Sequence, residues 1–433
     1  MQAILILILF LIIAALMVTR KIPTLIALPA LAIGIAIIAG IPLKLVNPET
    51  KADTGLLAGI IEGGSLRLAS AYVAVMFGAW LGQIMNQTGI SKSIVKTAAE
   101  LGGDRPFFIT ICITAAIAIL FTTISGLGAV IMIGSIAVPI LLSVGVPPIV
   151  AVSMFLFGMG IGLEINMSNW SFYITATGVS LDQVRNFALI LMALTAIDAL
   201  LFAIIEFRKE GIRFTWAQNN LKQSQKVNES QKVNVFSLLT PIVPILFVLI
   251  LKWPIIPSFM IGIVYSLITT QKSIKNAIST LTKTAYDGIA DAAPAVLLMI
   301  GIGMLLNAVM HPMVSKSLEP VLKSIIPTTP VAYVLFFGIL APLALYRGPL
   351  NLWGLGSGIA GLLISLNILP PTAVMGALLS TERVQAIGDP TNTHNVWLAN
   401  YAGIDVNKLL MKLLPYIWAL AFAGIITASI LFF

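Results

Sequence analysis

Charged residues are scarce in this sequence. Of its 433 residues, 10% are Asp, Glu, Lys or Arg, whereas 58% are hydrophobic, and the mean hydropathy is +1.02. A soluble fold of this length needs a polar surface that so few charged residues cannot supply. The excess of Lys and Arg over acids would suggest nucleic acid in a soluble chain, but here we expect no nucleic-acid partner. The composition predicts a polytopic membrane protein.

Cysteine is nearly absent, and the sequence lacks the common catalytic motifs. The single cysteine, Cys112, lies in an apolar segment, so an internal disulfide is excluded and a thiolate metal site is not expected. We find no H-E-x-x-H motif, no nucleophile elbow and no paired catalytic aspartates. Asp389 and His394 could carry out acid–base chemistry, but an enzyme within the membrane is not the expected function.

Long apolar segments are what the sequence does contain. They have the length of membrane-spanning helices, about 17 to 25 residues, whereas barrel strands would alternate apolar and polar residues over about ten. The fold class is therefore predicted as all-α. The first segment is expected to be an anchor and not a signal peptide, because Thr19-Arg20-Lys21 and another apolar segment follow it. The spans expected before the middle of the chain are 2–18, 23–42, 68–86 and 186–205.

Two apolar segments of this first half are interrupted by polar residues. The run 106–143 contains Thr122-Thr123-Ile124-Ser125-Gly126, which predicts a turn and therefore a re-entrant hairpin. The helix expected at 147–178 is interrupted at 164–169. A polar tract, 207–234, has a composition that cannot bury a core and is predicted to be a linker.

The second half repeats this order. Ser91-Lys92-Ser93 recurs as Ser315-Lys316-Ser317, Pro147-Pro148 recurs as Pro370-Pro371, and Glu164 aligns with Asp389, all at nearly constant separation. We therefore predict two repeats, 1–206 and 235–433. The features expected in the second are spans at 235–251, 255–270, 292–310 and 412–432, a hairpin at 329–367 and a broken helix at 370–403.

Each repeat would contain five spans and one hairpin. An odd number of spans forces the second repeat to enter the membrane inverted. Lys and Arg are more than twice as frequent in the loops that would share one side with Arg20 and Lys21, which predicts that this side is cytoplasmic. Both termini are then expected outside the cell's inner (plasma) membrane, with the linker 207–234 in the cytoplasm.

Several ionisable side chains fall at membrane depth. Facing lipid, each charged one would cost about 2.5 to 3.5 kcal/mol, so they are expected to face one another or a cavity. Glu382 and Arg383 could instead be structural, each paired elsewhere. The side chains concerned are Glu164, Arg347, Glu382, Arg383, Asp389 and His394.

The helix breaks predict a cation site. The helix that ends at a break presents carbonyl groups, and nearby carboxylate, amide and hydroxyl oxygens are ligands that sodium prefers. Either carboxylate could carry a proton instead, and Asn166 and Asn169 could cap a helix. Sodium, the only cofactor considered, would bind at Glu164/Asn166 and at Asp389/Asn392. The cation-coupling candidates are Thr123, Glu164, Asn166, Ser168, Asp389, Thr391, Asn392 and Thr393.

The hairpin tips predict an anion site. Arg347 can bind a carboxylate with two hydrogen bonds and stays charged when buried, and Gly348-Pro349 provides the turn that would aim it inward. The first tip offers the hydroxyl group of Ser125 and the backbone amide of Gly126. The substrate-binding candidates are Ser125, Gly126, Asn169, Arg347, Gly348, Asn351, Arg383, His394 and Asn395.

Two repeats, each with a hairpin followed by a helix broken at an Asn/Thr/Ser-rich loop, resemble the ion transporter superfamily, particularly its citrate-metal symporter and gluconate permease branches. Thr391-Asn392-Thr393 resembles the Ser-Asn-Thr signature of sodium-coupled dicarboxylate symporters, whereas the tips, Ile124-Ser125-Gly126 and Arg347-Gly348-Pro349, depart from it. The resemblance implies a homodimer whose hairpins and broken helices move against a fixed scaffold, as in an elevator.

The sequence thus predicts cation-coupled symport of a small carboxylate such as citrate, gluconate or a dicarboxylate. Import of a dianion opposes about 2.3 kcal/mol per charge per 100 mV, which two co-transported cations would cancel. The alternative is a sodium/proton antiporter, which would need no anion partner. A channel does not call for duplicated sites. The expected partners are an anionic solute, the lipid bilayer and a second copy of the chain.

Overall fold

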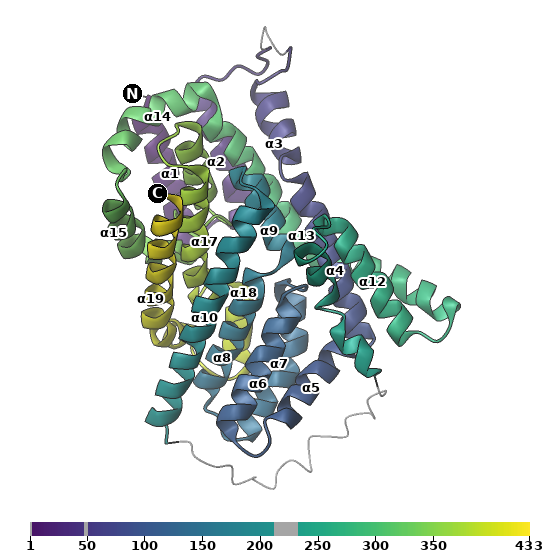
Figure 1. The fold of residues 1–433 in the computed structure, drawn as a ribbon. Helices are drawn as coiled ribbons and strands as arrows, with labels where there is room; N and C mark the ends of the chain where they lie inside the picture. The colour runs from purple at the N-terminus through teal and green to yellow at the C-terminus, as the bar shows by residue number, and fades with distance from the viewer. Residues whose placement is uncertain (1, 47–50, 212–232) are drawn as a thin grey trace.

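The prediction of an all-helical membrane protein is confirmed. The computed structural model describes residues 2–46, 51–211 and 233–433, and in these ranges the chain forms helices and no strand, apart from an isolated bridge between Val46 and Asp53 (Figure 1). Six helices of the described ranges are long and apolar enough to cross a membrane, or seven when one bent pair is counted as a span. The prediction of five spans in each half, in opposite orientations, stays a prediction.

The first half begins with two short apolar helices and ends with a long one. Its elements are α1 (Gln2–Val18), α2 (Thr24–Ile38), the π-helix η1 (Leu56–Glu62), α3 (Gly63–Leu66), α4 (Ala69–Gln87), α5 (Ile90–Leu101), α6 (Pro106–Phe121), α7 (Gly126–Ser143), α8 (Pro148–Glu164), α9 (Met167–Thr177) and α10 (Leu181–Lys209). The linker predicted at 207–234 falls mostly outside the described residues, and α10 continues into its first positions.

The second half has a similar order of elements. They are the 3₁₀ helix η3 (Val235–Leu239), α11 (Val243–Leu249), α12 (Ile255–Thr270), α13 (Ile274–Met310), α14 (Pro312–Ile325), α15 (Pro330–Leu340), the 3₁₀ helix η4 (Ala341–Arg347), α16 (Gly356–Ser365), α17 (Pro371–Gly388), α18 (Thr393–Tyr401) and α19 (Val406–Phe432). The amphipathic helices α5 and α14 contain the repeated Ser-Lys-Ser segments.

Among the predicted spans, three differ most from the observed helices. The span expected at 68–86 begins at Leu56, and the one expected at 292–310 is the end of α13, which begins at Ile274. The span expected at 235–251 is divided into η3 and α11. Packing explains the first difference: a Cβ on Gly64 would lie 2.6 Å from the Cα of Met304, so the absence of a side chain lets α3 lie directly against α13.

The broken helices lie within the bundle. α8 and α17 contact each other, α10 packs against α8, and α19 packs against α17, while α4 and α13 form another tightly packed pair (Figure 1). The first helix break, residues 165–166, separates α8 from α9 with a 58° bend. The second helix break, residues 389–392, separates α17 from α18. Residues 122–125 connect α6 to α7, and residues 348–355 lie between η4 and α16. These two connections and the two helix breaks position the candidate site.

Candidate functional site

A cavity of about 600 Å³ lies where both connections and both helix breaks meet. The first connection and the start of α7 contribute Ser125 and Gly126, and the end of η4 and the second connection contribute Arg347 and Trp353. α13 contributes a wall that includes Asp291. Apolar side chains such as Phe121 and Met159 form much of the remaining wall. The polar and charged side chains on the wall are Ser125, Asn166, Ser168, Asn169, Asp291, Arg347, Glu382, Gln385, Asn392, Thr393 and His394.

Asn166 ties the first break to the first connection. Its Oδ1 accepts hydrogen bonds from the backbone N–H groups of Ser168 (3.0 Å) and Asn169 (3.3 Å), and so caps α9. Its Nδ2 donates to the carbonyl oxygens of Phe121 (3.0 Å) and Ile124 (3.2 Å). The capping role considered for Asn166 is therefore observed, and the same side chain also lines the cavity.

The second break is bonded mostly within its own turn, although Nη2 of Arg20 also donates to the carbonyl oxygen of Pro390 (3.3 Å). Oδ1 of Asp389 accepts from the backbone N–H (2.8 Å) and the hydroxyl group (2.6 Å) of Thr391, and the carbonyl oxygen of Asp389 accepts from Nδ2 of Asn395 (3.0 Å). Asn392 starts α18 without a side-chain cap. Oδ2 of Asp389 and Oδ1 of Asn395 are buried and have no hydrogen-bond partner within the described ranges. Both are oxygens of the kind that hold hard cations.

Arg347 is held in a strained turn at the end of η4. Tyr346 and Arg347 have positive φ angles of 58° and 52°, a region that non-glycine residues rarely adopt. Nη1 of Arg347 donates to the carbonyl oxygen of Trp353 (3.1 Å), and Trp353 stacks on Phe172 at 4.0 Å between ring centroids. A Cβ on Gly348 would lie 2.2 Å from the carbonyl oxygen of Leu343. The turn needs glycine there and fixes Arg347 at the cavity wall.

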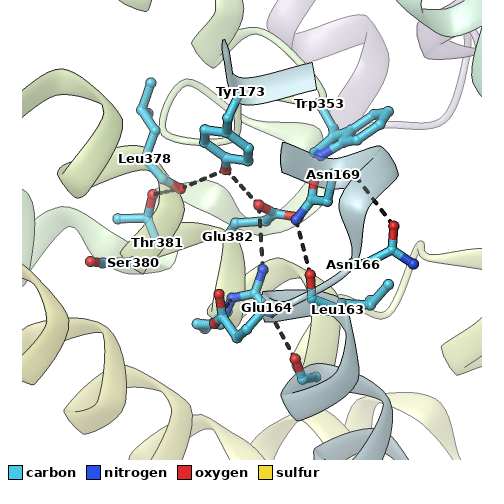
Figure 2. A network of polar contacts seen from close by, with 12 residues as sticks. Leu163, Glu164, Asn166, Asn169, Tyr173, Trp353, Leu378, Ser380, Thr381 and Glu382 are labelled. Atoms are coloured by element: carbon cyan, nitrogen blue, oxygen red, sulfur yellow. Dashed lines mark hydrogen bonds and ion pairs between the residues drawn. The ribbon is translucent and has the colours of Figure 1, made fainter. Parts of the chain in front are cut away.

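A buried ionic network joins the two halves behind this wall. Arg383 is 0% exposed, and its Nε lies 2.8 Å from Oε1 of Glu164, which is also 0% exposed. Figure 2 shows Glu164, Glu382 and Tyr173, three other members of this network. Nη2 of Arg383 lies 3.3 Å from Oε2 of Glu382, and Nη1 donates to the carbonyl oxygen of Gly160 (3.2 Å). Oε2 of Glu382 also accepts a hydrogen bond from the hydroxyl group of Tyr173. Glu382 reaches the cavity wall, whereas Arg383 and Glu164 face each other.

Several predicted site residues lie outside the cavity wall. Asn351 is buried and accepts from the backbone N–H of Trp353 (2.9 Å), so it shapes the second connection. Thr123 donates to the carbonyl oxygen of Leu120 (3.3 Å) in its own turn. The remaining predicted residues that do not line the cavity are Glu164, Gly348, Arg383, Asp389, Thr391 and Asn395.

Two residues of the cavity wall, Asp291 of α13 and Gln385 of α17, were not among the site residues predicted from sequence. Asp291 accepts a hydrogen bond from Gln83 of α4, and its carboxylate oxygens lie 2.9 and 3.0 Å from the position of a Cβ on Gly128. Gln385 of α17 also lines the wall. The membrane span was expected to begin at residue 292, which left Asp291 just outside it. Only the continuity of α13 places this carboxylate beside the first connection.

Comparisons with known proteins identify the fold. No family model matches the sequence, and no curated protein matches it. The YdaH transporter of Alcanivorax borkumensis has a similar structure, with a TM-score of 0.62, 13% identity, and coverage of 94% of this chain and 97% of that chain. MtrF of Neisseria gonorrhoeae, described among antimetabolite efflux pumps, has a TM-score of 0.58, 13% identity, and coverage of 95% and 94%. The chain thus shares its fold with two membrane transport proteins, and these matches give no support to the citrate-metal symporter or gluconate permease branches.

Proposed function

We propose that this protein is a secondary active transporter of a small organic anion. The observation that carries the proposal is the cavity at which both connections and both helix breaks meet, with Arg347 on its wall. A transporter needs a solute site that two symmetry-related parts of the molecule can expose in turn. The structural similarity to two proteins described as a transporter and an efflux pump supports the same class.

The wall chemistry supports a carboxylate with a partly apolar or donor-bearing body. Arg347 is the cationic group suited to a carboxylate, and Asn169 and Ser125 add neutral hydrogen-bonding groups. Asp291 and Glu382 place two acidic side chains on the same wall. A trianion such as citrate would be opposed by both of them, whereas a monocarboxylate with hydroxyl or amine donors would be satisfied by them. We therefore rank gluconate-like solutes ahead of citrate.

Cation coupling remains part of the proposal. The unpartnered oxygens of Asp389 and Asn395 support a cation at the second break. An elevator movement, a homodimer, a location in the inner membrane and a cytoplasmic linker belong to the same proposal. Whether the solute is imported or exported follows from the direction of the coupling gradient, so both directions belong in its test.

Reconstitution into liposomes tests this function. Radiolabelled gluconate, succinate, butyrate and citrate are offered under an imposed sodium or pH gradient, both for uptake and for release from loaded vesicles. We expect gradient-dependent movement of a monocarboxylate by the wild type, with at least a tenfold loss for Arg347→Gln, since losing one buried charged partner costs about 2 to 5 kcal/mol. Arg208→Gln, an exposed position on α10, is the control. Absence of movement of every carboxylate under both gradients contradicts the proposal.

Cation antiport is the second candidate, favoured by the acidic side chains of Asp291 and Glu382 on the cavity wall. Such an exchanger needs no anion partner. Under this alternative Arg347→Gln keeps sodium/proton exchange, measured with a pH-sensitive dye trapped in the vesicles, whereas Asp291→Asn loses it. Under carboxylate transport, Arg347→Gln instead loses movement of the carboxylate, because Arg347 is then the essential group.

A further inference from the structure

The ionic network behind the cavity carries more carboxylates than cations. Glu164 and Glu382 share one guanidinium group, that of Arg383, and the exposed fractions of the three residues are 0%, 5% and 0%. Tyr173 adds a neutral hydroxyl donor to Glu382. With both carboxylates ionised the network holds a net negative charge in a desolvated place. Such a charge is unfavourable unless a further cation neutralises it.

The geometry favours a proton as that cation. Oε2 of Glu164 is buried and has no hydrogen-bond partner within the described ranges, so it can accept a proton without losing an existing bond. The same ranges contain no group of three or more His, Cys, Asp or Glu side chains that could hold a metal ion. Glu382 reaches the cavity wall, which gives the buried carboxylate a route to water through a neighbouring side chain.

Among the described residues, Arg383 is the one cationic side chain that interacts with Glu164. The charged and titratable side chains that interact electrostatically with Glu164 are Arg383 and Glu382 from α17 and Tyr173 from α9. α10 and α19, which also pack near α8, carry a separate cluster around Glu206, whose carboxylate pairs with Lys412. The titratable side chains of this cluster are Asp198, Glu206, Lys209, Lys412 and Tyr416.

We propose that the carboxylate pair Glu164 and Glu382, bridged by Arg383, is the binding site of the coupling proton. This proposal rests on the proposed transport function and names its coupling ion. The proton enters from the cavity at Glu382 and is held between the two carboxylates. The protonated network is neutral and the deprotonated network carries one negative charge. Binding or release of the proton therefore changes the charge beside the solute.

The sign of the coupling between proton and solute depends on the charge of the solute. A carboxylate bound at Arg347 brings negative charge into the cavity that Glu382 also lines, so it favours protonation of the network. By thermodynamic reciprocity, the proton then favours binding of the anion, which is the condition for symport. A bound cation would expel the proton and produce antiport. One site therefore supports either direction of coupling, depending on the charge of the solute.

Infrared difference spectroscopy of the full-length purified protein tests the site without any transported solute. We expect a band of a protonated carboxylic acid whose intensity follows pH. Glu164→Gln and Glu382→Gln each leave one carboxylate with one guanidinium group, so the band is lost in both variants. Arg383→Gln leaves two carboxylates without a cation, so the band is retained or increased. Glu319→Gln, in an exposed pair with Lys323, is the control and keeps the wild-type band.

The band is expected to disappear in the two glutamate variants and to stay or grow in Arg383→Gln. Misfolding would instead affect the band of all three variants alike. A wild-type band in Glu164→Gln or in Glu382→Gln overturns the proposal, and so does a loss of the band in a folded Arg383→Gln protein. If one variant fails to fold, the other two still decide.

A second measurement separates the site from the transport function. In liposomes, gluconate is the test anion, and Glu164→Gln is expected to exchange labelled for unlabelled gluconate while losing accumulation driven by a pH gradient. Full pH-driven accumulation by this variant overturns the proposal. If the wild type moves no carboxylate at all, the proposed function fails, and the infrared result alone then decides whether the network binds a proton.

Discussion

The two helix breaks carry similar residues but bond them differently. At the first break, Asn166 makes hydrogen bonds to the start of α9 and to the connection between α6 and α7. At the second, Asn392 makes no capping bond, and Asp389 is bonded by Thr391 two residues away. The first break is therefore held by a distant part of its own repeat. The second is held mostly by its own turn, with one further bond from Nη2 of Arg20 to the carbonyl oxygen of Pro390 (3.3 Å).

The acidic residues of the two breaks differ in the same way. Glu164 is paired with Arg383 of α17 and so links the two halves of the chain. Asp389 interacts electrostatically with Arg347, but no ion pair within 4 Å joins them among the described residues. Bonds to distant elements resist rearrangement more than bonds within one turn do. We therefore expect substitutions of the side chains that anchor the first break, such as Asn166, to lower the free energy of unfolding more than substitutions at the second break.

The largest difference in the loss of unfolding free energy is expected between substitutions of the two arginines, Arg383 and Arg347. Arg383→Gln leaves two buried carboxylates without their cation, which costs about 3 to 5 kcal/mol of unfolding free energy. Arg347→Gln removes a half-buried side chain that has one hydrogen bond to Trp353, and costs about 1 kcal/mol. Unfolding in detergent, followed by the fluorescence of the tryptophans, measures both.

The loss for Arg383→Gln is expected to be smaller in acid, because protonation of Glu164 or Glu382 then removes the uncompensated charge. The loss for Arg347→Gln is expected to change little over the same pH range. Equal losses for the two variants at alkaline pH would show that the ionic network does not hold the two halves together.

A smaller difference in the loss of unfolding free energy is expected between substitutions of Asn166 at the first break and Asn392 at the second. Asn166→Ala removes a helix cap and leaves the carbonyl oxygens of Phe121 and Ile124 without their donor, which costs about 2 kcal/mol. Asn392→Ala removes no capping bond and is expected to cost less than about 0.5 kcal/mol. Asn166→Asp keeps an acceptor for the cap but places a buried carboxylate oxygen against the carbonyl oxygens of Phe121 and Ile124, so at neutral pH it is expected to cost at least as much as Asn166→Ala. If Asn392→Ala lost as much unfolding free energy as Asn166→Ala, the two breaks would not differ in how they are held.

The positions of the connections and breaks could be predicted from sequence. Proline, glycine and polar residues that interrupt apolar segments are a local signal. This signal marked the surroundings of Ser125, Arg347 and Asn392 as interruptions. Cavity residues such as His394 were found by the same reasoning, because a polar side chain at membrane depth needs a polar environment.

Partners across the two halves could not be predicted. Glu382 and Arg383 are adjacent, and which of them faces the cavity depends on how α17 packs against α8. Arg383 was expected at the anion, but α17 directs it to Glu164, where it has a buried counter-ion. Asp291 was missed because the start of α13 is amphipathic and resembles a surface segment. Local patterns indicate where a helix breaks, whereas helix packing decides which side chains meet there.

The smallest difference in stability is expected within the second break and its counterpart. Thr391→Val removes the hydroxyl bond to Asp389 but keeps the backbone bond, and costs about 1 kcal/mol. Ser168→Ala removes a bond to the carbonyl oxygen of Ala74 on α4 and should cost a similar amount.

The effects of these two variants on transport should differ. Thr391 orients the carboxylate of Asp389, whose other oxygen has no hydrogen-bond partner in the described ranges, whereas Ser168 fastens the first break to α4. We expect Thr391→Val to alter the cation dependence of gluconate movement and Ser168→Ala to leave it unchanged. If both variants change it equally, the second break is not the more adaptable of the two.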